Sequence, residues 1–165
     1  MRTINEIILH CAATPEGKDY TVADIDRWHR ARKFNGIGYH YVIYRDGTVH
    51  LGRPESQQGA HCTGHNAHSI GVCYIGGCAA DGKTPKDTRT AAQKGAMEAL
   101  VRKLLKQYPR ATVHGHNEMT CQRAQREAGF RSAECSRNCA GCEFSAKACP
   151  SFDVKAWLKS IGIKQ

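Results

Sequence analysis

Short apolar runs along the chain predict the strands of a sheet. Each run is too short for a buried helix and is bounded by glycine, proline or polar residues, which favours a buried strand. The runs lie at residues 6–11 and 70–75, and residues 111–116 are predicted to form another strand. The run at 70–75 is apolar throughout, so we expect it near the centre of the sheet.

A hairpin is predicted around Asp46 and Gly47. These residues lie between β-branched and aromatic runs at 39–44 and 48–51, and Asp-Gly is a strong signal for a tight turn between paired strands. Alternation along the first of the two strands would place Tyr39 and Tyr41 on the same face.

Three helices are predicted from capping signals and from apolar residues at helical spacing. The clearest runs over about 88–107 and stops before a proline. Its apolar positions are Met97, Leu100, Val101, Leu104 and Tyr108. An earlier helix starts at a capping box formed by Thr21 and Asp24 and runs to about residue 33. A short amphipathic helix follows Ser151, which we expect to cap it.

The order of these elements predicts an α/β fold. Strands that alternate with helices, together with one hairpin, imply a mixed β-sheet flanked by helices. A length of 165 residues suits one domain, which we place at residues 1–165. Residues 119–146 lack apolar periodicity and interrupt this domain as a Cys-rich insert. The cysteines of the insert are Cys121, Cys135, Cys139 and Cys142.

Composition narrows the function classes. The apolar fraction of 41% and the mean hydropathy of −0.54 are those of a soluble globular protein, and no apolar run is long enough to span a membrane. The N-terminus lacks the pattern of a secretory signal, so we expect synthesis in the cytoplasm with reduced cysteines. The net charge of +9 favours an anionic partner, such as nucleic acid, a membrane surface or bacterial cell wall. Aromatic residues are only 7%, which argues against a stacking surface for single-stranded nucleic acid.

A set of potential zinc ligands is distributed along the chain. Cys149 follows Lys147 by two residues, His10 ends the first apolar run, and His114 and His116 flank a glycine. Two histidines and one cysteine form a known catalytic zinc set that leaves the fourth position open for water. The spacing alone allows His114, His116 or both as ligands.

Four separated segments resemble the type 2 N-acetylmuramoyl-L-alanine amidases, a family that includes amidase-type phage lysozymes and peptidoglycan recognition proteins. The segments are residues 8–14, 38–49, 68–73 and 147–153. The resemblance implies a mixed sheet flanked by helices, zinc as cofactor and peptidoglycan as partner. It also implies hydrolysis of the amide bond between N-acetylmuramic acid and the L-alanine of the stem peptide.

The resemblance also implies roles for individual residues. The zinc ligands would be His10, His116 and Cys149, and the catalytic pair would be Tyr39 and Lys147. The family places its ligand two residues before an acidic residue, here Glu118, which selects His116 over His114. The long loop at 52–68 is typical of a functional loop. We expect weak substrate contacts from three histidines in or near it: His40, His61 and His68.

Alternatives remain open for the insert and for the function. The four insert cysteines would bind a second, structural zinc, form two disulfides after export, or stay free. The main alternative function is a non-catalytic peptidoglycan-binding module. A radical iron–sulfur motif at Cys135, Cys139 and Cys142 would need a barrel that a chain of this length does not offer. A zinc-ribbon-like nucleic-acid binder would show salt-dependent binding to DNA. We expect a monomer with no nucleic-acid partner, and action on the wall would require a separate export route.

Overall fold

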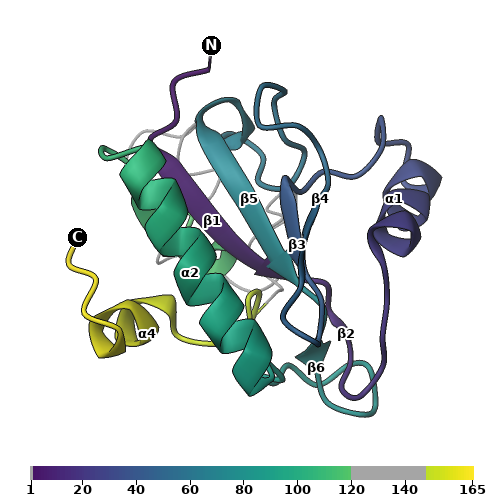
Figure 1. Cartoon of the computed structure of the whole chain (residues 1–165). Coiled ribbons are helices and arrows are strands. Elements are labelled where there is room, and N and C mark those ends of the chain that lie inside the picture. The colour runs from purple at the N-terminus through teal and green to yellow at the C-terminus, as the bar shows by residue number, and fades with distance from the viewer. Residues whose placement is uncertain (1, 120–147) are drawn as a thin grey trace, which may run out of the picture.

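The apolar runs at 6–11 and 70–75 form the middle of a mixed sheet, and the strand at 111–116 forms one edge, in a computed structural model that describes residues 2–119 and 148–165 (Figure 1). The sheet has five strands in the order β4-β3-β5-β1-β7. Their bounds are Glu6–Cys11 for β1, Tyr41–Ile43 for β3, Val49–Leu51 for β4, Ser69–Tyr74 for β5 and Thr112–Gly115 for β7. β3 and β4 form the predicted antiparallel hairpin, and β3–β5, β5–β1 and β1–β7 are parallel pairs. The predicted α/β class is confirmed.

A second sheet of two short strands follows the ends of β1 and β5. β2 (Thr14–Pro15) and β6 (Gly77–Cys78) pair in parallel, shortly after the ends of β1 and β5. This pairing keeps the segments that leave β1 and β5 side by side. The carboxyl ends of the two strands therefore open into one region, where ligands of parallel sheets commonly bind.

β1 and β5 are buried on both sides, by helices on one face of the sheet (Figure 1) and by the loop at 52–68 on the other. α2 (Ala91–Gln107) and α4 (Val154–Ser160) pack on one face. Alternate residues of β1, Ile7 and Leu9, point into this core together with Met97 and Leu104 of α2. α1 (Val22–Ala31) packs on the opposite face, against a separate cluster that includes Val42.

The helix caps show where local sequence decides the boundaries. The predicted capping box of Thr21 and Asp24 begins α1. α2 begins at Ala91, three residues later than predicted, because Thr90 and Gln93 form a second capping box. The prediction that Ser151 caps the last helix is wrong. Asp153 caps α4 through Ala156 N, while Ser151 adopts a left-handed φ of 68° and donates its hydroxyl to Gly77 O.

Tyr39 and His116 lie outside the strands in which the sequence pattern placed them. β3 begins only at Tyr41, so alternation does not extend back to Tyr39. Tyr39 packs against the cluster on the α1 face, whereas Tyr41 belongs to the core beneath α2. The prediction that the two tyrosines share a face is therefore wrong. β7 ends at Gly115, and His116 begins the short 3₁₀ helix η2 (His116–Glu118) instead of continuing the strand.

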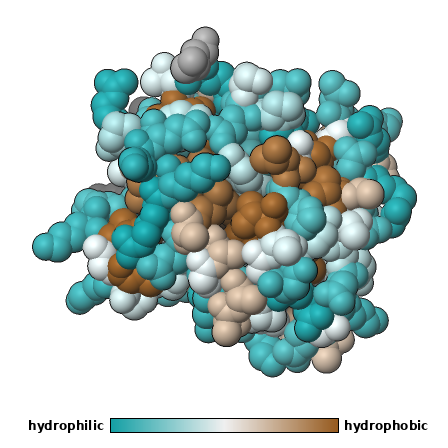
Figure 2. All heavy atoms as spheres, viewed as in Figure 1, coloured by the Kyte–Doolittle hydropathy of each residue, from teal (hydrophilic) through white to brown (hydrophobic). Residues whose placement is uncertain are grey.

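The surface around α2 is mostly hydrophilic, with hydrophobic residues gathered beside the helix (Figure 2). The hairpin contributes two large exposed apolar side chains, Val49 and Leu51 on β4, of which Leu51 is 72% exposed. Among residues 2–119 and 148–165, no helix combines the length and apolarity needed to cross a bilayer. Lys147 and the four insert cysteines lie outside the described residues, and the single-domain boundary of 1–165 remains a prediction.

A candidate metal centre in a cleft

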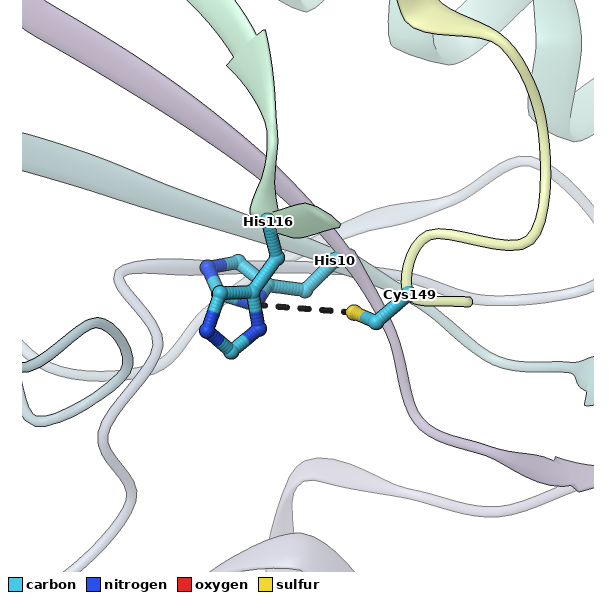
Figure 3. A group of neighbouring side chains, drawn as sticks. All are labelled: His10, His116 and Cys149. Carbon is cyan, nitrogen blue, oxygen red and sulfur yellow. Dashed lines mark hydrogen bonds between the residues drawn. The ribbon is translucent and has the colours of Figure 1, made fainter. Parts of the chain in front are cut away.

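Three potential ligands from distant parts of the chain meet at the carboxyl end of β1 (Figure 3). His10 lies near the end of β1, His116 follows β7 directly, and Cys149 lies in the segment that leads to α4. Their ligand atoms all lie within 4.8 Å of one another, and Cys149 Sγ is 3.8 Å from His10 Nδ1. The side chains are buried, with 1%, 9% and 8% exposed for His10, His116 and Cys149. Two imidazoles and one thiol at this separation fit a zinc ion.

Backbone contacts hold Cys149 in this position. Its carbonyl accepts a 2.8 Å hydrogen bond from Asn117 N, which ties it to the turn that carries His116. Its thiol lies 3.3 Å from Cys11 N at the end of β1. The next residue is also fixed, because Tyr74 Oη donates a 2.8 Å hydrogen bond to Pro150 O. The centre is thus held by β1, β5 and η2 together.

The structure separates His116 from His114. The ring of His114 is half-buried, and its Nε2 lies 2.7 Å from Thr112 Oγ1 while Nδ1 lies 3.7 Å from Glu118 Oε2. The end of β7 at Gly115 turns His116 toward His10, with a separation of 4.5 Å between ring centroids. Of the described histidines that flank Gly115, His116 alone belongs to the ligand cluster.

The cluster opens into a cleft of about 650 Å³. His116 and Cys149 line it from the sheet side, and Trp28 and Phe34 line it from α1 and the turn that follows. The lining also includes two basic residues, Arg32 and Lys83. This volume is within the range of small-ligand sites.

Tyr39 lies against the cluster from the α1 side. Its ring centroid is 5.0 Å from that of His10 and 5.3 Å from that of His29. Burial, and then the neighbouring thiols of Cys73 and Cys149, raise the pKa of Tyr39 well above its usual value. The hydroxyl therefore stays protonated at neutral pH and acts as a hydrogen-bond donor, here toward the Cys73 thiol. His29 accepts a 2.9 Å hydrogen bond from Gly38 N, which fixes the backbone directly before Tyr39.

Comparison with known proteins decides the family to which this arrangement belongs. A family model described as N-acetylmuramoyl-L-alanine amidase matches residues 1–150. The chain belongs to this amidase family. The resemblance carried by the four sequence segments is thereby confirmed.

The similarity to other proteins extends over most of the chain. The endolysin of Escherichia phage T7 is 35% identical over 151 residues, which cover 92% of this chain and 83% of the relative. The peptidoglycan-recognition protein SD of Drosophila melanogaster is 32% identical over 99 residues, covering 59% of this chain and 50% of that protein. The solved structure of the N-acetylmuramoyl-L-alanine amidase LysC from Clostridium intestinale superposes with a TM-score of 0.71 at 24% identity, covering 99% of this chain and 88% of that structure. The similarity to this solved structure shows that the two chains share a fold.

In this member of the amidase family, His61 lies behind His10 as a supporting partner. His10 Nε2 is 3.0 Å from His61 Nδ1, and His61 Nε2 is 3.4 Å from Ser69 Oγ. Burial, followed by the nearby rings of His40 and His116, lowers the pKa of His61 well below its usual value. A neutral His61 that accepts from His10 Nε2–H leaves the Nδ1 lone pair of His10 facing Cys149, as metal ligation requires.

Two glycines, Gly59 and Gly71, leave the space that the ring of His61 occupies. A Cβ at Gly71 would come within 2.6 Å of the His61 ring, and a Cβ at Gly59 would come within 2.5 Å of it. The sequence analysis identified His61 only as a weak substrate contact. Its support of His10 follows from a loop that folds back over β5, and the sequence offers only the two glycines as a signal.

Two other predicted substrate contacts lie outside the cleft lining. His40 is fully buried, and its Nδ1 accepts a 3.0 Å hydrogen bond from Gly71 N. His68 lies 3.3 Å from Glu6, at the opposite end of β1. A direct role in substrate binding is therefore not proposed for either residue. His61 does line the cleft, so its contact with substrate remains a prediction.

Proposed function

We propose that the protein is a zinc-dependent peptidoglycan hydrolase that cleaves the amide bond between N-acetylmuramic acid and L-alanine. The observation that carries this proposal is the convergence of His10, His116 and Cys149 beside a cleft, which His116 and Cys149 line, in a member of the amidase family. The donor set matches catalytic zinc sites, in which three protein ligands leave a fourth position open. Membership of the N-acetylmuramoyl-L-alanine amidase family supports the proposal that the amide between N-acetylmuramic acid and L-alanine is the bond cleaved.

The side chains around the cluster suit amide hydrolysis. When bound, zinc would lower the pKa of water from its much higher bulk value to about 7 and polarise the amide carbonyl. His61 keeps the ring of His10 oriented toward Cys149 through the 3.0 Å contact between the two histidines. The protonated hydroxyl of Tyr39 donates a hydrogen bond to the oxygen on which negative charge develops. Lys147, assigned by its place two residues before Cys149, adds a cation there. One such donor is typically worth about 3–4 kcal/mol in the transition state.

The charge of the cleft supports an anionic substrate. Arg32 and Lys83 both line it, and the chain has a net charge of +9. Stem peptides carry free carboxylates, which such cations attract. The half-buried rings of Trp28 and Phe34 in the lining offer apolar surface for the sugar and peptide backbone.

A non-catalytic binding module is the second candidate, and the similarity to peptidoglycan-recognition protein SD favours considering it. Such a module needs the cleft but has no need of a metal centre. The buried thiol of Cys149 within reach of two histidines favours the hydrolase.

Digestion of purified sacculi tests the proposal. The full-length protein is incubated with sacculi, and the released fragments are analysed by mass spectrometry and end-group labelling. We expect new free L-alanine amino termini and no new sugar reducing ends, with loss of activity after chelation and recovery after addition of zinc. New reducing ends alone would identify a glycosidase instead. Binding to sacculi without any release would favour the binding module.

A further inference from the structure

A second group of potential metal ligands lies at the opposite end of the same face of β1. Glu6, Ile8 and His10 alternate along β1 and therefore point to one side of the sheet. Glu6 meets His65 and His68, and the ligand atoms of these three residues all lie within 4.8 Å of one another. Four residues along a strand separate Glu6 from His10 by about 13 Å, so the two clusters cannot share one ion.

The two histidines converge on one carboxylate oxygen. His65 Nδ1 lies 2.8 Å from Glu6 Oε2, and His68 Nε2 lies 3.3 Å from the same atom. A tetrahedral zinc ion with bonds of about 2.0–2.2 Å places its ligand atoms about 3.3–3.6 Å apart. The contact with His68 already has this length, and the contact with His65 needs to open by only about half an ångström.

Local backbone geometry places the histidines together. His65 precedes the 3₁₀ helix η1 (Asn66–His68) as its N-terminal cap residue, and His68 N donates to His65 O at 3.2 Å. In such a turn, side chains three residues apart lie one above the other. The sequence spacing of the two histidines is therefore converted into a pair that faces Glu6.

The group is held in place before any ion binds. Asn5 N donates a 3.0 Å hydrogen bond to His68 O, which ties the start of β1 to the end of η1. The guanidinium of Arg2 donates to the carbonyls of Asn66 and Ser69, both at 2.8 Å. Preorganised ligands lose little freedom on binding, which favours affinity.

Burial and access also suit a metal ion. His65 is buried, and its Nδ1 faces Glu6 Oε2. The side chains of Glu6 and His68 are 18% and 37% exposed, so an ion has a path from solvent and water completes its coordination. Two imidazoles and one carboxylate suit zinc, whereas magnesium and calcium prefer oxygen ligands alone.

We propose that Glu6, His65 and His68 form a second zinc site, which clamps the start of β1 to the loop at 52–68. The same loop carries His61, which supports His10, and Cys62 packs on Ile8 between the two clusters. Zinc at Glu6 would therefore stabilise the loop from the end remote from the cleft. The proposal does not depend on the amidase activity.

Zinc titration of the full-length protein tests the proposal. Chelator-treated and dialysed samples are titrated with zinc chloride by calorimetry, for the wild type and for Glu6→Gln and His68→Asn. The matched controls are Glu98→Gln and His50→Asn, which lie outside both clusters. We expect both cluster variants to bind one zinc ion fewer than the wild type and the controls to bind the same number. Any zinc held by the insert cysteines contributes equally to all five proteins. Equal binding by the wild type and both cluster variants would overturn the proposal.

Crystallography gives an answer that does not depend on the folding of a variant. Wild-type crystals grown with zinc should show an anomalous peak at the zinc absorption edge between Glu6, His65 and His68. A peak at His10, His116 and Cys149 without one at Glu6 would overturn the second site. A magnesium titration should give no heat at this site.

Discussion

The two ends of one face of β1 carry metal-ligand clusters that were assembled in different ways. At the His10 end, the partners come from distant segments, and the ligands include a thiol and are almost fully buried. At the Glu6 end, His65 and His68 come from a single turn of one loop, and two of the three ligands, Glu6 and His68, are partly exposed. Ile8 lies between the clusters and packs against Cys62 and Met119.

The difference is the reason why we propose a catalytic role for one cluster and a structural role for the other. His116 and Cys149 of the His10 cluster line a cleft of about 650 Å³, through which a substrate would reach the open position of a bound metal. None of the Glu6 cluster lines that cleft. Removal of a ligand should therefore abolish chemistry at one end of β1 and reduce stability at the other.

The largest expected effect is at Cys149. Cys149→Ala should lose one zinc ion and all measurable turnover of sacculi, because two histidines alone hold zinc weakly. Glu6→Gln should keep turnover while it loses the other ion. Metal analysis together with the sacculus digestion measures both. Full turnover by Cys149→Ala would remove the proposed catalytic centre.

The choice between His114 and His116 gives the next contrast. His116→Ala should lose the metal and turnover, whereas His114→Ala should keep both, because His114 contacts Thr112 and Glu118 outside the ligand cluster. The pair is matched in residue type and lies on either side of Gly115. If His114→Ala loses the metal and His116→Ala keeps it, the assignment is reversed.

Substitution of Lys147 should impair catalysis without loss of metal binding. Lys147→Ala should retain zinc but lose turnover by roughly two to three orders of magnitude, the scale of one removed oxyanion donor. Lys155→Ala on α4 is a suitable control, because Lys155 is exposed and lies outside the cleft lining. Initial rates at saturating sacculi and the zinc content of each variant provide the comparison. Unchanged turnover would show that Lys147 does not act on the developing charge.

The smallest effect is expected at the Glu6 end. At a free zinc concentration 100-fold above the dissociation constant, the wild type should gain about 2.7 kcal/mol of unfolding free energy from this site. Glu6→Gln should lack this gain and, without zinc, should differ by only about 0.5–1.5 kcal/mol from loss of the hydrogen bond with His65. Urea unfolding with and without zinc measures both quantities, with Glu98→Gln as the control. A zinc-dependent gain that persists in Glu6→Gln would place the stabilising ion elsewhere.

The sequence by itself determined the elements whose causes are local. The capping box at Thr21 and Asp24, the Asp-Gly turn and the apolar run of β5 all formed as predicted, since each depends on residues close together in the chain. The sequence segments around His10 and Cys149 also identified the family, because they keep their order and identity regardless of how the chain folds.

The tertiary structure alone decided which side chains meet. Tyr39 packs on the α1 face because β3 begins two residues after it, and His116 turns toward His10 because β7 ends at Gly115. His61 lies behind His10, and His65 reaches Glu6, because the loop at 52–68 folds back over β1 and β5. Where a strand ends and how a loop crosses a sheet depend on contacts between segments far apart in sequence. Periodicity describes only neighbours along the chain, so it left these four positions undetermined.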